Sequence, residues 1–250
     1  MLKELKILKH HGKQYIEDLR KQSISPLFRG RPLISEKISE EEINAAAAVC
    51  PVRAIDSRTG SIDLGRCVFC KECAFLLPES IEFTNDYRMA CNDRNDLIIK
   101  PGDKSSLVIN EMKIRKEIRD LFKGALKLRQ VSAGGDNSCE MELSASCNVN
   151  FDLGRYGVEF VASPRHADGI VITGPISVNM SRALEITYDA IPEPKIIVLA
   201  GTDAISSGIF EGSPAIDRSF LEKHHIDLYV PGNPAHPLTF INGIMDLLGI

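Results

Sequence analysis

The chain has 250 residues, of which 44% are hydrophobic and 26% charged, and its formal net charge is −4. These are the values of a globular protein long enough for one large domain or two modest ones. The slightly acidic balance excludes a general affinity for nucleic acid, and the sequence holds no apolar run of about eighteen residues that would span a membrane.

Seven cysteines indicate a reducing compartment, because four of them follow a metal-ligand pattern and not a disulfide framework. The first residues lack the apolar stretch of a secretory signal. We therefore expect a cytoplasmic protein, with peripheral attachment at the inner face of the membrane as the alternative.

Residues 1–32 form a basic segment, with eight Lys/Arg against three Asp/Glu. Apolar residues recur at helical spacing, first at 2, 5, 7 and 8 and then at 15, 16 and 19. The pattern predicts an amphipathic helix. Such a helix lies on a membrane surface or a partner subunit, or packs on its own chain, and the sequence leaves these alternatives open.

Residues 33–105 are predicted to form a small, loop-rich domain around a cysteine motif. Cys67, Cys70 and Cys73 form a C-x-x-C-x-x-C run, and Cys50 stands before a proline. Two-cluster bacterial ferredoxins use C-x₂-C-x₂-C-x₃-C-P runs, in which the Cys before Pro ligates the other cluster. The four cysteines therefore supply a complete ligand set for one 4Fe–4S cluster.

The second cluster of that arrangement is predicted to be absent. Counting by the same spacing, four ligand positions hold other residues, namely Glu40, Ile43, Ala46 and Leu77. These four are the full ligand set of one cluster, so one cluster is kept and the other lost as a unit. The alternatives are a zinc site or buried free thiols. A Cys₄ zinc site usually pairs two C-x₂₋₄-C knuckles, and a third cysteine at another x₂ step is unusual there.

Further along, short strands are expected at 54–55, 61–64 and 80–83, and a basic helix at 111–129 is expected to bridge two domains. From 151 onward, strand-length apolar runs at 158–162, 169–173, 196–200 and 226–230 alternate with helical stretches near 178–190, 216–223 and 238–247. Such alternation predicts a parallel sheet covered on both faces.

Glycine-containing loops follow three of these strands, and two carry polar side chains, Asp203 and Asn233. Ligands of open α/β sheets bind at the carboxyl ends of the strands, so both residues are candidates for one site that the segment 136–139 joins. The alternative is ordinary turn chemistry, in which Asp and Asn cap the next helix.

At these loops the sequence resembles a known family. The stretches LKLRQVSAGGDNSCEMEL, YGVEFVASPRHADGIVITGPIS, AIPEPKIIVLAGTDAISSGIFEGS and IDLYVPGNPAHPLTFINGIMDLLG resemble the small subunit of NiFe hydrogenases of the energy-converting (group 4) type. They also resemble the small, quinone-proximal subunit of complex I. Upstream, FRGRPLIS and CPVRAIDSRTGSIDLGRCVFCKEC resemble the two-cluster ferredoxin-type subunit of the same complexes. The resemblance implies a flavodoxin-like parallel-sheet domain at 111–250, fused to a preceding ferredoxin-like α+β iron–sulfur domain.

The resemblance also points to an altered site. The family binds a proximal 4Fe–4S cluster through a C-x-x-C pair and one Cys in each of two later loops. In this sequence the four positions hold Asp136, Cys139, Asp203 and Asn233, so a single thiolate remains. Glu142 matches a family Glu after the pair, and the resemblance places Arg165 beside the site. We therefore expect the standard proximal cluster to be absent.

Three occupants of the altered site stay open: a divalent metal on the oxygen ligands and Cys139, hydrogen bonds and water, or a ligand supplied with a partner. Cys147 joins the site if the chain turns back, and otherwise Cys147 and Cys91 are expected to be buried small side chains. The six histidines show no metal spacing and are expected to be structural or surface residues.

Three functions compete. The first is an electron-transfer subunit with one 4Fe–4S cluster, docked on a large subunit that resembles that of NiFe hydrogenase or its counterpart in complex I. An electron carrier such as ferredoxin is a further expected partner. The second is a subunit of a hydrogenase-derived enzyme with a repurposed metal or substrate pocket. The third is a non-redox assembly module with a purely structural cluster.

Overall fold

The computed structural model describes residues 2–250. Its C-terminal part is a five-stranded, all-parallel sheet with the order β6-β5-β7-β8-β9. The strands are β5 (Leu126–Ser132), β6 (Val158–Phe160), β7 (Gly169–Thr173), β8 (Ile196–Ala200) and β9 (Leu228–Val230). In chain order this is 2-1-3-4-5, the flavodoxin-like arrangement. The predicted fold class is confirmed.

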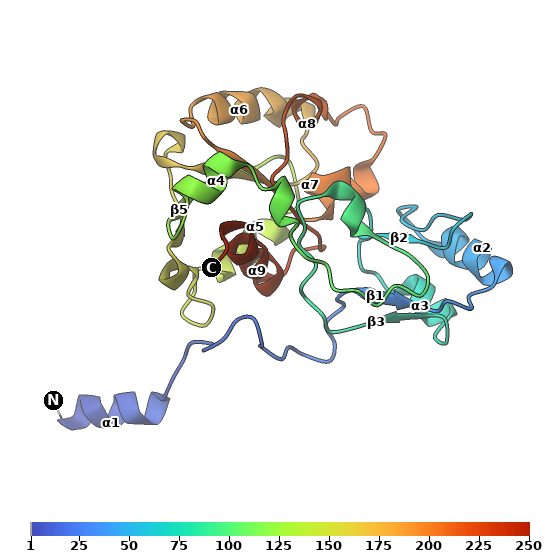
Figure 1. Cartoon of the computed structure of the whole chain (residues 1–250), viewed down its shortest axis with the longest axis horizontal. Coiled ribbons are helices and arrows are strands. Elements are labelled where there is room, and N and C mark those ends of the chain that lie inside the picture. Colours follow the sequence, from blue (N-terminus) through green and yellow to red (C-terminus); the bar gives the residue numbers. More distant parts are fainter. Residues whose placement is uncertain (1) are drawn as a thin grey trace.

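Helices cover both faces of the sheet (Figure 1). They are α5 (Ser138–Ala145), α6 (Val178–Asp189), α7 (Thr202–Ser206), α8 (Ser219–Lys223) and α9 (Pro237–Leu248). Successive strand residues point to opposite faces. Ile170 and Ile172 therefore pack in one core with Phe220 of α8, while Val171 packs in the other with Ile244 of α9. Because both faces are covered, every residue of β7 and β8 is buried, as their continuous apolar sequences predict.

The predicted helix at 111–129 is wrong over its second half. The segment forms a 3₁₀ turn, η2 (Glu111–Lys113), and a short helix, α4 (Lys116–Leu121), before β5 begins at Leu126. The helix ends at Leu121 with Phe122 as its C-cap, and Gly124, with φ of 151°, lies between it and β5. Leu126 and Leu128 are completely buried, because β5 is paired on both sides by β6 and β7. This long-range pairing overrides the local helical spacing.

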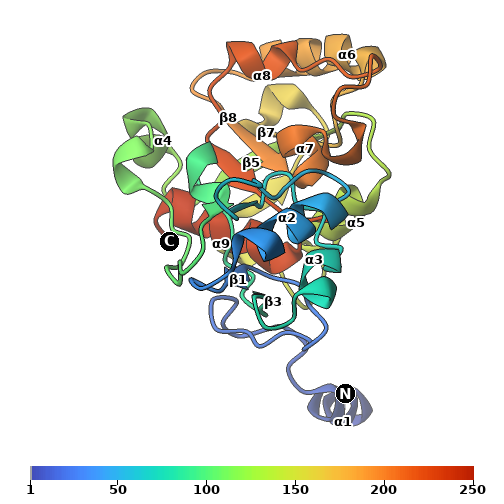
Figure 2. The same ribbon diagram turned by 90° about the vertical axis from the view of Figure 1, so that its right-hand side faces the viewer.

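The N-terminal part is a small α+β unit (Figure 2). β1 (Pro32–Ile34) pairs antiparallel with β3 (Ile81–Phe83), and β2 (Ile62–Asp63) pairs antiparallel with β4 (Ile98–Ile99). Helices α2 (Glu40–Val49) and α3 (Glu72–Leu76) accompany them, and η1 (Arg94–Leu97) precedes β4. The expected strands at 61–64 and 80–83 are present in shortened form. The strand expected at 54–55 is only a bridge from Ile55 to Ile62.

The two parts share one hydrophobic core. Ile62 and Phe83 of the small unit belong to the same buried cluster as Ile172 and Leu199 of the parallel sheet. An antiparallel bridge between Cys91 and Tyr229 links them further. The domain limits 33–105 and 111–250 remain an interpretation of the sequence.

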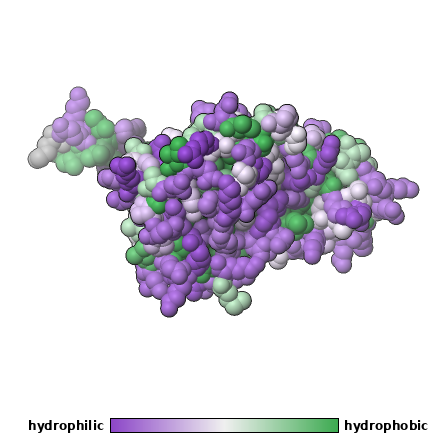
Figure 3. Space-filling view, turned by 90° about the horizontal axis from the view of Figure 1, so that it is seen from above, coloured by the Kyte–Doolittle hydropathy of each residue, from purple (hydrophilic) through white to green (hydrophobic). Residues whose placement is uncertain are grey.

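The N-terminal segment is helical only over α1 (Leu2–His11). This helix projects away from the rest of the chain and buries none of its residues (Figures 1 and 3), so Leu2, Leu5 and Leu8 are exposed. The continuation of the predicted helix to Leu19 is wrong. The Leu19 side chain is buried, and its carbonyl accepts hydrogen bonds from Tyr87 and Asn242. Across residues 2–250, no helix has the length and apolarity needed to cross a membrane.

Candidate functional site

The four cysteines of the predicted cluster motif converge on one small cavity. Cys50 is the C-cap of α2, Cys67 and Cys70 lie in the loop before α3, and Cys73 lies within α3. All four line the cavity, together with apolar side chains that include Val52, Ala54, Ile55, Ile62 and Phe83. All seven cysteines of the chain are free. Two segments, separated by β2, thus bring four thiols around a common space with largely apolar walls.

The backbone around these cysteines is shaped for a compact group. Phe69 and Lys71 both have positive φ, 53° and 74°, which curls the loop between the cysteines. The N–H of Ala54 donates to Cys50 Sγ at 3.2 Å, and the N–H of Phe69 donates to Cys67 Sγ at 3.3 Å. Donors aimed at sulfur favour the thiolate form, and hydrogen bonds to sulfur tune iron–sulfur potentials.

Burial makes the isolated thiols hard to ionise. It raises the pKa of Cys73 to about 11, with a further rise from the charges of the neighbouring cysteines. The pKa of Cys67 is also raised, chiefly by burial. At neutral pH these thiols are therefore protonated unless a cationic centre lies among them. Iron inside the cavity would supply that charge, because metal binding releases protons from cysteine ligands.

A single zinc ion and a 4Fe–4S cluster place different demands on four thiolates. Zinc draws its thiolates to one point at about 2.3 Å. In the part of the chain that the structure describes, no three His, Cys, Asp or Glu side chains are arranged to hold one metal ion. A 4Fe–4S cube instead takes one thiolate at each of four separate irons, which spreads the ligands around a larger core. Four thiols lining one cavity fit that donor set.

The structure places the two aspartates of the altered family site at the carboxyl edge of the sheet. Asp136 follows β5, and its carboxylate accepts hydrogen bonds from the N–H and the hydroxyl of Ser138, at 2.9 and 2.6 Å. These bonds lower its pKa. Asp203 lies in the first turn of α7, and its Oδ1 is buried without a hydrogen-bond partner. Burial raises the pKa of Asp203, and the charge of Asp136 adds to the rise.

Cys139 lies at the start of α5 and packs against the loop after β8. A Cβ on Gly201 would meet Cys139 Sγ at 2.4 Å, and the φ of Gly201 is 96°. Burial raises the pKa of Cys139 to about 12, so its thiol is neutral. The thiol therefore serves as a packing group in this arrangement. Among residues 2–250, no group of three His, Cys, Asp or Glu side chains is arranged to hold a metal ion, here or elsewhere.

The remaining residues of the altered site face elsewhere. Glu142 and the exposed Asn233 line a second cavity of about 280 Å³, with Arg29, Phe69 and His236. Burial raises the pKa of Glu142 and lowers that of His236. Arg165 is exposed. Cys91 is fully buried, as expected, whereas Cys147 is exposed, so the expectation of burial was wrong for it.

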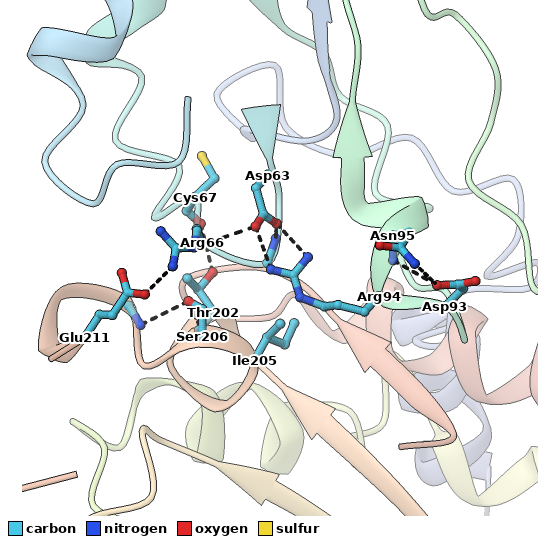
Figure 4. Close-up of polar contacts among 12 residues, drawn as sticks. Asp63, Arg66, Cys67, Asp93, Arg94, Asn95, Thr202, Ile205, Ser206 and Glu211 are labelled. Carbon is cyan, nitrogen blue, oxygen red and sulfur yellow. Dashed lines mark hydrogen bonds and ion pairs between the residues drawn. The ribbon is translucent and has the colours of Figure 1, made fainter. Parts of the chain in front are cut away.

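A residue that the sequence analysis missed joins the two sites. The hydroxyl of Thr202 donates to the carbonyl oxygen of Cys67 at 2.8 Å (Figure 4). The N–H of Thr202 donates to Gly232 O. The loop after β8 is thus fixed directly against the cysteine loop. Arg29 adds hydrogen bonds to the carbonyls of Phe69 and Cys70. The sequence carries no signal for Thr202, because its partner lies 135 residues away.

The pKa of Asp203 is raised and that of Asp136 is lowered, so replacing each by Asn should change the stability in opposite directions. We expect Asp203→Asn to raise the melting temperature at pH 7 by roughly 2–4 °C, because it removes a charge that burial disfavours. The gain should vanish as the pH falls toward 3.8, the ordinary value of this carboxyl. Asp136→Asn should lower the melting temperature at pH 7, since the pKa of Asp136 is depressed, and this loss should shrink below pH 3.8. Thermal unfolding between pH 3 and pH 8 measures both, and equal signs at pH 7 would contradict the assignment.

The molecule is thus a flavodoxin-like α/β protein with a cysteine-lined cavity beside the carboxyl edge of its sheet. Residues 137–247 match the family model described as NADH ubiquinone oxidoreductase, 20 Kd subunit. The chain is 31% identical over 115 residues to the probable membrane-bound hydrogenase subunit mbhJ of Pyrococcus furiosus, which covers 46% of this chain and 69% of the relative. The chain belongs to this NADH ubiquinone oxidoreductase family, as the resemblance predicted.

The chain is also similar to other proteins. The B subunit of the NADH-quinone oxidoreductase of Geotalea daltonii is 37% identical over 109 residues, which is 44% of this chain and 64% of that relative. An uncharacterized protein of Methanocaldococcus jannaschii is 32% identical over 132 residues, 51% of this chain and 86% of the relative. In the membrane-bound sulfane sulfur reductase, an archaeal respiratory membrane complex, one chain superposes with a TM-score of 0.45 at 26% identity, covering 51% of this chain and 71% of that one. The family match begins at residue 137, so the four cysteines of the cavity lie outside it.

Proposed function

We propose that this chain is an electron-transfer subunit of an iron–sulfur oxidoreductase complex of the hydrogenase or complex I type. It carries one 4Fe–4S cluster on Cys50, Cys67, Cys70 and Cys73. The observation that carries the proposal is the convergence of these four thiols on one cavity, held against the sheet edge by the bond from Thr202 to Cys67. Family membership supplies the class of complex.

The standard proximal cluster of the family is absent in this proposal. Iron–sulfur iron is held by thiolates, and the four corresponding positions offer one. The contacts support the same conclusion, because Asp136 is engaged by Ser138 and Cys139 is packed on Gly201. Electrons that reach the retained cluster therefore leave by a route other than the family's usual one.

A large subunit related to that of NiFe hydrogenase, or to its counterpart in complex I, is the proposed docking partner. A soluble carrier of the ferredoxin class is a second proposed partner. The exposed helix α1, basic and apolar on different sides, offers a contact for peripheral attachment at the cytoplasmic face of a membrane complex. The relatives named as membrane-bound hydrogenase and quinone oxidoreductase subunits support this placement.

Metal analysis of the anaerobically purified chain, alone and with its copurifying partner, tests the proposal. The expected result is about four iron and four sulfide per chain, with an EPR signal on reduction. Protein that stays metal-free after anaerobic reconstitution would refute the cluster, and about eight iron per chain would refute the loss of the second one. A cluster that no accessible potential reduces would favour a purely structural role.

A second candidate function uses the 280 Å³ cavity as a repurposed substrate pocket. Its lining combines apolar Phe28, Phe69 and Met89 with the polar Arg29 and Glu142. Apolar walls with a few polar groups of shifted pKa are typical of small-molecule sites. Glu142→Gln should then lower turnover of the intact complex without changing its iron content. Unchanged turnover would leave electron transfer as the sole role.

A further inference from the structure

A third cavity lies where the cysteine-bearing unit meets the parallel-sheet unit. It has a volume of about 560 Å³ and is lined by three arginines, Arg66, Arg94 and Arg218, and by the serines at 206, 207 and 213. Arg66 directly precedes the cluster cysteine Cys67. Figure 4 shows Arg66 and Arg94 above the α7 helix that carries Ser206. Neither the family match nor the proposed electron-transfer role assigns a function to this group.

The positive charge of this cavity is only partly neutralised. Arg94 makes a two-pronged pair with Asp63, at 2.8 and 2.6 Å. Arg66 pairs with Glu211 at the exposed rim. Within the described residues, the hydrogen bonds of Arg218 end on carbonyl oxygens, those of Pro175, Asp203 and Ile205, and not on a carboxylate. Three guanidinium groups thus face two carboxylates.

Partial burial disfavours the charged form of Arg218. Burial lowers its pKa to about 10, and the positive charge of Arg94 contributes to the decrease. The charge of Glu211 opposes that decrease. A half-buried cation that donates to no carboxylate favours binding of an anion, since the anion restores the interaction energy that desolvation removed. The carbonyl contacts fix the orientation of the guanidinium but cannot neutralise it.

We propose that this cavity binds the phosphate group of a small molecule. The planar fork of Arg66 matches phosphate oxygens. Arg218 adds the N–H groups that its three carbonyl bonds do not use, and the three serine hydroxyls supply further donors. The cavity has the size of a small-molecule site. A free phosphate ion and a nucleoside monophosphate share this chemistry.

In the absence of phosphate, the Glu211 carboxylate occupies the anion position beside Arg66. Its carboxylate is half exposed and binds Arg66 across the rim. Exposed pairs of this kind contribute little to stability, so a phosphate with a higher charge displaces Glu211 readily. Removing the Glu211 charge should therefore strengthen phosphate binding, whereas a purely structural network predicts no such gain.

Isothermal titration of the full chain, purified anaerobically and held at constant ionic strength, tests the proposal. The probes are inorganic phosphate and adenosine monophosphate. Arg218→Gln is expected to weaken binding about tenfold, the effect of losing one charge-assisted contact. Glu211→Gln is expected to tighten binding several-fold. The control Arg88→Gln removes an arginine that pairs with Asp86 outside this cavity, and it should leave the dissociation constant unchanged.

The same titrations identify the source of the phosphate. Tighter binding of the monophosphate than of inorganic phosphate assigns the site to a nucleotide, and equal binding assigns it to free phosphate. Absence of binding to the parent chain overturns the proposal, as does a dissociation constant that Glu211→Gln leaves unchanged. The Glu211 variant keeps the test decisive even where Arg218→Gln fails to fold, because its exposed rim position makes misfolding a minor concern.

Discussion

Replacing Cys67 by Ser is expected to lower the iron content from about four atoms per chain to less than one. Cys67 is one of the two buried members of the quartet. A serine hydroxyl does not ionise at neutral pH, so the site would lose a quarter of its thiolate charge and one corner of the cube. Iron and sulfide analysis, with the visible absorbance of the cluster, measures the effect.

Two other cysteines provide matched controls. Cys147→Ser changes an exposed thiol outside the cavity, and its iron content should equal that of the parent chain. Cys139→Ser changes the single thiol kept at the altered family site and should also retain about four iron per chain. Loss of iron from Cys139→Ser, with Cys67→Ser unaffected, would reverse the assignment and place the cluster at the family's usual position.

Removing the Asp227 carboxylate should destabilise the fold by about 3 kcal/mol. Asp227 is 5% exposed. Its oxygens accept two hydrogen bonds from Arg115, at 2.9 and 3.0 Å, and one from the N–H of Ile197 in β8, at 2.9 Å. Asp227→Ala leaves that N–H and the guanidinium without their partner. Chemical denaturation at pH 7 would report the change as a lower midpoint with an unchanged slope.

An exposed ion pair provides a comparison for the destabilisation expected from Asp227→Ala. Lys127 and Glu159 lie 3.7 Å apart with both side chains about half exposed, and Glu159→Ala should cost less than about 1 kcal/mol. A double-mutant cycle with Arg115→Ala isolates the share due to the ion pair. If Asp227→Ala costs no more than Glu159→Ala, the connection between the segment before α4 and the sheet is not a stabilising element.

The family match and the cysteine cavity occupy different stretches of the chain. The match covers 137–247, while the four cysteines lie between 50 and 73. Shared core residues and the bond from Thr202 to Cys67 place these stretches side by side. The proposed cluster would therefore lie next to the carboxyl edge of the sheet, which carries the positions that the resemblance assigns to the family's own cluster. This proximity supports the proposed electron transfer through a single centre.

The sequence by itself determined the features that depend on near neighbours. The spacing of Cys67, Cys70 and Cys73 predicts their shared cavity, because a loop of this length can turn three side chains inward. Strands β7 and β8 have the bounds that their apolar runs predict. Both strands are buried on both faces, so every residue in them is apolar or small and the run ends where the strand ends. The resemblance to the family likewise predicts, from the sequence alone, that Asp136, Asp203 and Asn233 stand where the family has cluster thiolates.

Only the tertiary structure decided which distant groups meet. The local spacing of Leu126 and Leu128 predicts a helix. In the structure their segment is a strand, because β6 and β7 pair with it on both sides. Thr202 contacts Cys67, and Arg218 enters a cavity with Arg66, across separations that no local pattern encodes. The physical reason is that spacing along the chain fixes which face a residue presents, whereas the packing of one whole unit on another fixes what that face meets.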